Sequence, residues 1–379
     1  MADQTVGQHQ IHDFTLQSDT QHANPFQTRL SATFTHNSGA TIDHLPGFYD
    51  GKITWKIRFS PTLEGTWTGK TTSDDPALDG LDLDPILCTP NPNPHIKGIL
   101  QIDPENSRRF AWSNNDPCLP LGFEIDWLFS YHQADPGRCY KHVDLIAERG
   151  FNYIVTNLYA HTGFATRENN DTRPVDPEYI FGPPEHYLFE GTNDNPDHSR
   201  LNITFLQDFD RLMAYLHQKS LIVHLMLQVQ NKGVNWPARR SPEDDRFWRY
   251  IVARYQAYSN LIWDVGKESK NLLRQTGSHA YTLERMVLIR GADAYHHLVT
   301  VHDVEQRNAG IHSEPDRASD FVSDQIHLKD VGRYNREAIR RLRTLEKPYM
   351  NIEYGYELGT ETLKTYTGAS TAPWQDILK

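Results

Sequence analysis

The chain has few cysteines, and their number excludes two classes of small protein. Only Cys88, Cys118 and Cys139 occur in 379 residues. Three scattered cysteines are too few for a disulfide framework and lack the paired spacing of a zinc knuckle. We therefore interpret them as ordinary, partly buried thiols.

The sequence also shows no long apolar run, no basic excess and no visible secretory signal. No apolar stretch approaches the length of a membrane span, so no membrane partner is expected. Acidic residues outnumber basic ones by 49 to 38, whereas a duplex-binding protein needs a basic face, so nucleic acid is not expected as a partner. The start, "MADQTVGQHQIHDF", has neither a basic nor an apolar signal region. This predicts a cytoplasmic protein, although a secreted or periplasmic chain without its signal would look the same. The oligomeric state stays open.

What the sequence does contain is enough apolar material for two folded units. Its 38% hydrophobic and 11% aromatic residues suit a folded globular protein. Residues 1–105 alternate short β-type runs with turns rich in Pro, Gly, Asn and Asp, which predicts a small antiparallel β-sandwich. In "FYDGKITWKIRFSPTLEGTW", Trp55, Ile57 and Phe59 fall on one face of a strand.

Residues 106–379 repeat a different pattern, in which a buried strand is followed by a loop and an amphipathic helix. About seven such units follow one another, which favours an α/β fold of the (β/α)8 TIM-barrel type over an open sheet. No glycine-rich phosphate fingerprint follows the early strands, which argues against nucleotide binding. The predicted strands are "CLPLGFEIDW", "FNYIVTNLYA", "LIVHLMLQ", "LIWDVG", "HLVTVHD", "SDFVSDQIH" and "PYMNIEYG". The predicted helices lie near 137–150, 201–220, 242–258, 282–290 and 335–346.

Two features of this barrel are unusual. After the seventh strand, residues 358–379 show a partial helix but no eighth strand. Either the barrel is truncated before strand eight, which is the interpretation we adopt, or an element elsewhere in the chain fills that place. The segment 160–200 is a long loop rich in Asn, Asp and Pro. Tyr179, Phe181, Tyr187 and Phe189 give it apolar surface with which to cover the barrel mouth. A covered mouth favours a closed pocket and exo-action.

Two glutamates stand at the carboxyl ends of predicted strands, where barrel enzymes place their reacting groups. Glu268 follows strand four, and Glu353 ends strand seven. Strands four and seven lie on opposite sides of a barrel, so both carboxyls can reach one scissile bond. A retaining glycosidase needs such a pair at roughly 5–5.5 Å. Either glutamate alone would be an ordinary solvated or salt-bridged strand end.

Several of these stretches together resemble the apiosidase-like barrels of glycoside hydrolase clan A, which carry an N-terminal immunoglobulin-like module of unnamed type. "FYDGKITWKIRFSPTLEGTW" resembles the module. "LGFEIDWLFS", "ARYQAYSNLIWDVGKES", "HLVTVHD" and "NIEYGYE" resemble the barrel. The resemblance implies a retaining glycoside hydrolase without cofactor that acts on an oligosaccharide or a polysaccharide-derived glycoside. It implies Glu268 as acid/base and Glu353 as nucleophile.

Position 267 departs from the pattern of the resembled clan. Most members have an asparagine before the acid/base glutamate, where it contacts the sugar 2-hydroxyl, and this chain has Lys267. The lysine could bind an anionic group, or favour the ionised form of its neighbour. Because an ionised neighbour is a poor general acid, we expect the ammonium to point away from Glu268.

Further polar or aromatic residues at strand ends are candidates for binding the carbohydrate, because a ring of such groups suits polyol recognition. Tyr354 or Tyr356 could also hydrogen-bond the nucleophile. The substrate-binding candidates are Glu124, Asp126, Trp127, Asn157, His224, Gln228, Lys267, His302, Gln325, His327 and Tyr354.

Two other functions stay open. His224, His302, Asp303 and His327 could bind a metal and give a metal-dependent hydrolase. Against this, no His-x-His ends strand one. A non-catalytic carbohydrate-binding protein would keep the groove and lose the carboxyl pair, but both glutamates are present.

Overall fold

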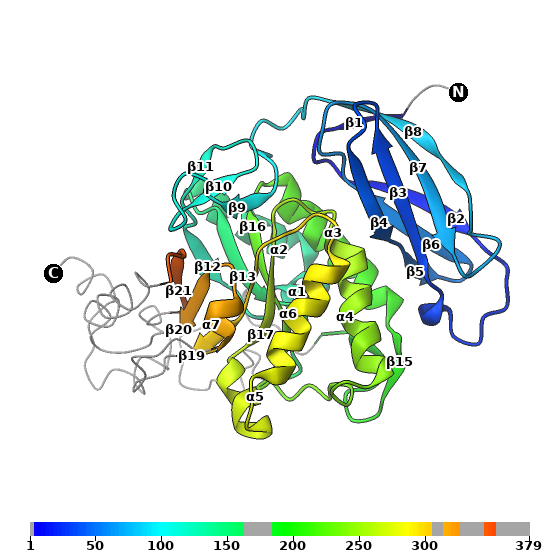
Figure 1. Ribbon diagram of the computed structural model, residues 1–379. Coiled ribbons are helices and arrows are strands. Elements are labelled where there is room, and N and C mark those ends of the chain that lie inside the picture. The colour runs from blue at the N-terminus through cyan, green and yellow to red at the C-terminus, as the bar shows by residue number, and fades with distance from the viewer. Residues whose placement is uncertain (1–3, 163–183, 305–313, 326–344, 354–379) are drawn as a thin grey trace, which may run out of the picture.

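The chain was analysed as a computed structural model that describes residues 4–162, 184–304, 314–325 and 345–353. Its N-terminal part is built from two antiparallel sheets and a 3-10 helix, η1 (Pro25–Gln27) (Figure 1). One sheet has the order β1-β8-β7-β3-β4, in which β1 alone pairs in parallel, and the other has the order β2-β6-β5. The strands are β1 (Gln4–Gly7), β2 (His12–Gln17), β3 (Leu30–His36), β4 (Thr41–Pro46), β5 (Phe48–Gly51), β6 (Thr54–Phe59), β7 (Gly65–Ser73) and β8 (Asp82–Thr89).

The two sheets enclose one apolar core, as the alternation in the sequence predicts. Trp55, Ile57 and Phe59 are all buried on one face of β6, which confirms the predicted strand face. Phe34 of β3 stacks on Phe59 with ring centroids 3.9 Å apart. The N-terminal part is therefore a β-sandwich held together by aromatic contacts across its two sheets.

The second part centres on parallel strands. One sheet has the order β12-β13-β16-β17-β18, and a second has the order β19-β20-β21. Their bounds are β12 (Gly122–Glu124), β13 (Tyr153–Asn157), β16 (Ile222–Val229), β17 (Leu261–Lys267), β18 (Val299–Thr300), β19 (His302–Val304), β20 (Val322–Gln325) and β21 (Tyr349–Glu353). All the predicted barrel strands are present, although "HLVTVHD" forms two short pieces. The predicted first strand is much shorter than expected, because Pro117–Cys118 (β11) pairs elsewhere.

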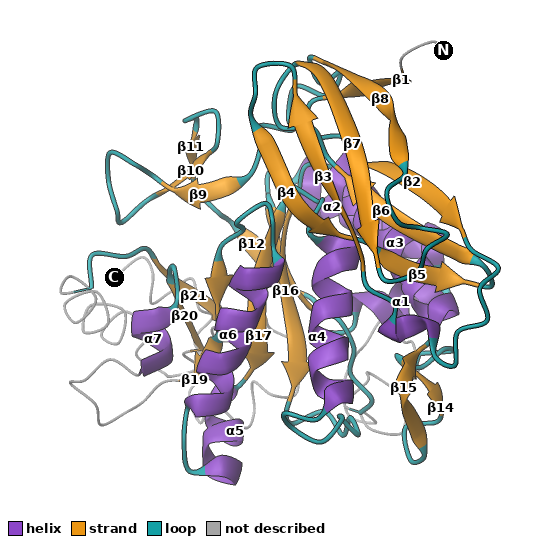
Figure 2. Cartoon of the chain, turned by 45° about the vertical axis from the view of Figure 1, so that its right-hand side comes forward, coloured by secondary structure: helices purple, strands orange, loops and turns teal. Residues whose placement is uncertain are grey.

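Helices cover the outside of the parallel strands; α4 and α6 lie side by side, and α6 lies against β17 (Figures 1 and 2). Local sequence explains where α4 starts. Ser241 caps it by accepting a hydrogen bond from the backbone N–H of Asp244, Pro242 occupies the first turn, and three acidic residues follow. The helices are α1 (Leu128–Ala134), α2 (Pro136–Glu148), α3 (Ile203–Gln218), α4 (Pro242–Tyr255), α5 (Ser269–Thr276), α6 (Ala280–Ala292) and α7 (Glu314–Ala318).

Four of the predicted helices correspond to α2, α3, α4 and α6, and the fifth, at 335–346, lies almost entirely outside the described residues. The sequence did not predict α1, α5 or α7, which are short. None of the helices that the structure describes combines the length and the apolar character that a membrane span requires.

The segment 160–200 is not one irregular loop. Its end forms a hairpin of β14 (Phe189–Gly191) and β15 (Pro196–Leu201), with Phe189 buried and Tyr187 partly buried against the main core. The middle of this segment, with Tyr179 and Phe181, lies outside the described residues, as does the chain after Glu353. A small sheet of β9 (Leu100–Ile102), β10 (Phe110–Trp112) and β11 completes the described elements.

The sandwich and the barrel part share a buried ionic junction. Asp210 of α3 accepts hydrogen bonds from Arg58 of β6 at 3.0 and 3.1 Å and from Arg254 of α4 at 2.7 and 2.9 Å. Arg254 also donates to Asp50 of the sandwich at 2.8 Å. The sandwich is therefore fixed along α3 and α4, on the outside of the barrel part (Figure 2).

Candidate active site

Five ionisable side chains meet where the parallel strands end. Glu124 ends β12, Asp126 follows it by two residues, and Lys267 ends β17. His302 begins β19, and Glu353 ends β21. Strands distant in sequence thus bring their polar residues to the carboxyl edge, where barrel folds place active sites.

Lys267 lies at the centre of this cluster. Its ammonium forms an ion pair with Glu124, contacts both oxygens of Asp126 at 2.8 and 3.0 Å, and lies 3.0 Å from Oε2 of Glu353. Its side chain is only 3% exposed. The ammonium thus donates hydrogen bonds to Glu124 and Asp126 and forms an ion pair with Glu353.

Burial and charge together set the protonation of the cluster. Burial alone would lower the pKa of Lys267, but the charges of Asp126, Glu124 and Glu353 outweigh it and raise that pKa well above its usual value. Burial also raises the pKa of Glu124 well above its usual range, against the lowering effect of Lys267. The pKa of His302 falls to about 4, first through burial and then through the charge of Lys267. His302 is therefore neutral at pH 7, and its Nε2 lies 3.6 Å from Oε2 of Glu353.

A second polar layer lies beneath the cluster. Asp264 of β17 accepts hydrogen bonds from Nε2 of His224 at 2.6 Å and from the backbone N–H groups of Gly266 and His302 at 2.8 and 3.0 Å. The other ring nitrogen of His224 bonds the Tyr153 hydroxyl. Burial opposes ionisation of Asp264, but the bond from His224 prevails and lowers its pKa.

This layer corrects the expectation for His224, which is fully buried in the middle of β16. Both of its ring nitrogens already have protein partners, so they are not free for a sugar or a metal. We assign His224 and Asp264 to the support of the site.

Glu268 stands immediately after β17 in a strained conformation. Its backbone is left-handed, with φ 53° and ψ 56°, which a non-glycine residue adopts at a cost of about 1–2 kcal/mol. Its carboxylate accepts a hydrogen bond of 2.7 Å from Asn271, one turn along α5. The carboxylates that Lys267 contacts, among the described residues, are those of Glu124, Asp126 and Glu353.

Trp127 is less available for sugar stacking than the sequence suggests. The ammonium of Lys232 lies 4.7 Å from the centre of its ring, and the same ammonium is 3.8 Å from Asp126. Trp127 also packs against the main core. One face of the indole therefore already carries a cation–π contact.

The other amide candidates differ in their surroundings. Asn157 is fully buried at the end of β13, and neither atom of its amide finds a hydrogen-bond partner among the described residues. Such a group requires an explanation, and binding of water or substrate would provide one. Gln228 accepts a hydrogen bond from Gln230, and Gln325 pairs with Glu353 in the register of β20 and β21. His327, Tyr354 and Tyr356, and the side chain of Asp303, lie outside the described residues.

Glu124, His302 and Glu353 each bring one potential ligand atom within 4.8 Å of the others. These distances would suit a cation. However, the ammonium of Lys267 already supplies the positive charge between the two carboxylates. A metal ion would therefore have to displace a buried ammonium.

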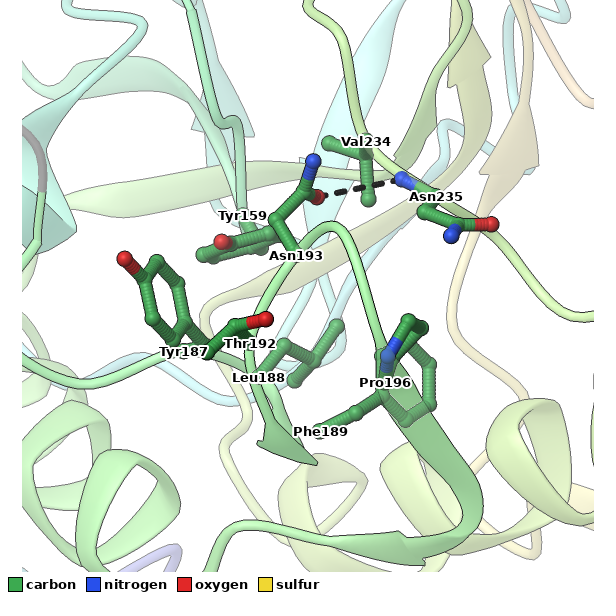
Figure 3. A pocket seen from close by; sticks show the side chains of 9 residues that line it. All are labelled: Tyr159, Tyr187, Leu188, Phe189, Thr192, Asn193, Pro196, Val234 and Asn235. Carbon is green, nitrogen blue, oxygen red and sulfur yellow. Dashed lines mark hydrogen bonds between the residues drawn. The ribbon is translucent and has the colours of Figure 1, made fainter.

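A separate small pocket lies against the β14–β15 hairpin (Figure 3). Tyr159, Tyr187 and Phe189 give it aromatic walls. The side chain of Asn193 accepts a hydrogen bond of 3.1 Å from the backbone N–H of Asn235, which ties the hairpin to the loop after β16. The members of the charged cluster do not line this pocket.

Three residues of the site were missed in the sequence. Asp264 is an acidic residue inside an otherwise apolar strand, and this unusual position could have indicated a role in the site. Lys232 lies in the loop after strand three, and Asn271 lies on a helix that was not predicted. Their roles depend on contacts across the fold, for which local sequence carries no signal.

Family models match both parts of the chain. The model "Apiosidase-like, catalytic domain" matches residues 105–375, and the model "Domain of unknown function (DUF5060)" matches residues 5–74. The family predicted from the sequence is therefore confirmed. No curated protein matches the chain significantly.

Solved structures of similar fold include a candidate glycoside hydrolase from Bacteroides vulgatus. It has a TM-score of 0.74 at 20% identity, over 92% of this chain and 64% of that chain. The present chain thus spans somewhat less than two thirds of that protein. A glycoside hydrolase family 5 structure from the same organism has a TM-score of 0.48 at 15% identity, over 74% of this chain and 57% of that chain. The family match supports the predicted class of enzyme, a glycosidase, and the structure with the TM-score of 0.74 supports the fold alone.

Proposed function

Because the chain belongs to the apiosidase-like catalytic-domain family, we propose that it is a retaining glycoside hydrolase, with Glu353 as nucleophile and Glu268 as acid/base. One observation carries the proposal most strongly. The carboxylate of Glu353 is buried at the end of a parallel strand, 3.0 Å from the ammonium of Lys267. A neighbouring cation favours the ionised form that a nucleophile needs.

The proposed reaction has two displacements at the anomeric carbon of the sugar. Glu353 attacks this carbon and forms a covalent ester, while Glu268 gives its proton to the leaving glycosidic oxygen. Glu268, now a carboxylate, removes a proton from water, and the water oxygen displaces Glu353 from the sugar. The two carboxyl groups and water supply all the groups required, so the reaction uses no metal or organic cofactor.

The position of Glu268 is consistent with its proposed role. Left-handed backbone at a non-glycine residue costs energy and is often found at functional sites. Here it occurs where β17 passes into α5. The hydrogen bond from Asn271 is compatible with a carboxylate that regains a proton in each cycle.

We further propose that the parallel strands form a (β/α)8-type barrel and that the sandwich is an immunoglobulin-like module, with the domains at 1–105 and 106–379. Contacts between β12 and β21, the first and last parallel strands described, support closure. The ion pairs of Lys267 with Glu124 and Glu353 also link these two strands. The module packs along α3 and α4, so we assign it a structural role.

The substrate is proposed to be a carbohydrate held by the polar groups around the cluster. Asn157 is the best supported ligand, because its buried amide lacks a partner among the described residues. The second candidate function is a metal-dependent hydrolase, favoured by the spacing of Glu124, His302 and Glu353. The contacts of Lys267 with both carboxylates make it the weaker candidate.

The proposal is tested with a panel of aryl glycosides and oligosaccharides, with the configuration of the first product followed by NMR. Glu353→Gln is expected to lower kcat by a factor of about a thousand or more, because the nucleophile is lost. Glu284→Gln is a matched control, since that glutamate is exposed on α6 and pairs with Arg240. Full activity of Glu353→Gln, or a first product of inverted configuration, would overturn the proposal.

A further inference from the structure

Lys267 makes more contacts than a surface lysine or a substrate ligand would require. Its ammonium joins the end of β17 to Glu124 and Asp126 at the end of β12, and to Glu353 at the end of β21. The ammonium donates hydrogen bonds to Glu124 and Asp126, and its side chain is only 3% exposed. Because three protein carboxylates enclose it, a bound sugar has little access to the ammonium.

From this geometry we propose that Lys267 is a positioning residue for Glu353 rather than a ligand of the substrate, and that the sugar bound over Glu353 is uncharged. The inference rests on the proposed role of Glu353 as nucleophile. It replaces the sequence-based expectation that Lys267 binds substrate.

The charges that face Glu353 explain why the ammonium is needed. Asp126 is a like charge in the same cluster, Glu124 adds a second when it is ionised, and His302 is neutral. The ammonium of Lys232 lies behind Asp126, at 3.8 Å. Lys267 is therefore a cation in direct contact with Glu353. Without it, repulsion from Asp126, and from Glu124 when it is ionised, would favour protonation of Glu353 and lower its nucleophilicity.

The same balance of charge decides which sugars can bind. Three carboxylic groups surround one ammonium, so the cluster has no spare positive charge. The carboxylate of a uronic acid would meet like charges and would find Lys267 already enclosed by three protein carboxylates. An uncharged sugar offers hydroxyl groups that can donate to carboxylates such as Asp126.

The pH dependence of kcat/KM tests the positioning role. The acid limb of this profile, where activity rises with pH, is expected to report the ionisation of Glu353. In Lys267→Met it should move up by about 1–3 pH units, because the positive charge next to the Glu353 carboxylate has been removed. In the double variant Lys267→Met/Glu124→Gln, one repelling carboxylate is also lost, and the limb is expected to move back towards its original position. An acid limb that is unchanged in Lys267→Met would overturn the inference, as would a double variant that shows no recovery.

Lys267→Arg provides a second test that does not depend on the folding of the Met variant. Arginine keeps the charge but replaces the compact ammonium by a planar fork, so the acid limb should stay while kcat falls at least tenfold. Thermal melts establish that each variant is folded. If Lys267→Arg changes KM alone, Lys267 binds substrate and the inference is wrong.

The predicted charge of the sugar is tested with pairs of aryl glycosides that differ only in a hydroxymethyl or a carboxylate group. We expect kcat/KM for the uncharged member to exceed that for the uronide at least a hundredfold. A uronide that is preferred by the wild type, and loses this preference in Lys267→Met, would overturn the inference. In that case Glu353→Gln would still be inactive, whereas an active Glu353→Gln would refute the proposed function itself.

Discussion

Asp210 is predicted to be the residue that couples the sandwich to the barrel part. It accepts hydrogen bonds from Arg58 of the sandwich and Arg254 of α4, at distances of 2.7 to 3.1 Å. Arg254 is fully buried, and Arg58 is nearly so. The substitution Asp210→Asn keeps the shape of the side chain and removes its charge.

The expected loss of stability follows from Arg58 and Arg254, whose guanidinium groups lose the charge of Asp210. Each keeps one other carboxylate, Asp13 for Arg58 and Asp50 for Arg254. Breaking a buried ion pair costs about 3–5 kcal/mol. Because partners remain here, we expect a loss of about 3 kcal/mol in the free energy of unfolding. In a chain of this size that corresponds to a fall in Tm of about 4 °C.

The measurement is thermal and urea unfolding of Asp210→Asn beside Asp82→Asn, a control on an exposed strand. Asp82 is 87% exposed and lies 3.8 Å from Lys70, so its loss should cost less than about 0.5 kcal/mol. Burial opposes ionisation of Asp210, but the charges of Arg58 and Arg254 lower its pKa. This stabilisation is therefore present at neutral pH and is lost as the pH falls below the ordinary range of a carboxyl. If Asp210→Asn is as stable as Asp82→Asn at pH 7, the junction does not hold the two parts together.

Three further predictions concern stability and metal dependence. His9, His217 and His302 are buried with pKa values lowered from 6.5 to about 4, so the unfolded chain binds more protons between these values. The free energy of unfolding should therefore fall as the pH is lowered from 6.5 to 4, by about 3 kcal/mol for each histidine. Urea unfolding at several pH values measures this, and a free energy of unfolding that does not change with pH in this range would contradict it. Asp264→Ala should lower the free energy of unfolding by about 3–5 kcal/mol, because it leaves His224 and two backbone N–H groups without their acceptor. A loss below about 1 kcal/mol in urea unfolding would contradict the supporting role of Asp264 and His224. Dialysis against EDTA should leave kcat unchanged, whereas activity lost with EDTA and restored by a divalent metal would favour the metal-dependent hydrolase.

Strand and helix periodicity was enough to predict the order of the main elements. The faces of β6 and α4 are set by local patterns of apolar residues and by caps such as Ser241, which are visible in the sequence. The short helices α1 and α5 were missed because they carry no cap signal: Trp127 and Glu268 precede them without a capping side-chain bond. Elements of one or two turns depend on tertiary contacts more than on their own sequence.

The candidate site was predictable as a set of positions but not as a network of contacts. Glu124, Lys267 and Glu353 could be placed at strand ends because barrels expose those ends at one face. That one ammonium contacts all three carboxylates depends on the reach of a lysine side chain and on the register of distant strands. His224 shows the opposite case, because a histidine on a barrel strand can lie at the mouth or in the middle. Whether His224 lies at the mouth or in the middle of the barrel depends on the register of β16 with β13 and β17.

The identity of the nucleophile is tested most directly by trapping the covalent intermediate. A 2-deoxy-2-fluoro glycosyl fluoride of the sugar found in the substrate panel should inactivate the protein and add the mass of one sugar. Peptide mapping should place this mass on Glu353, and Glu353→Gln should remain unlabelled. An adduct on Glu124 or Glu268, or turnover of the panel substrate to an inverted product without any adduct, would contradict the assignment of Glu353 as nucleophile of a retaining glycoside hydrolase.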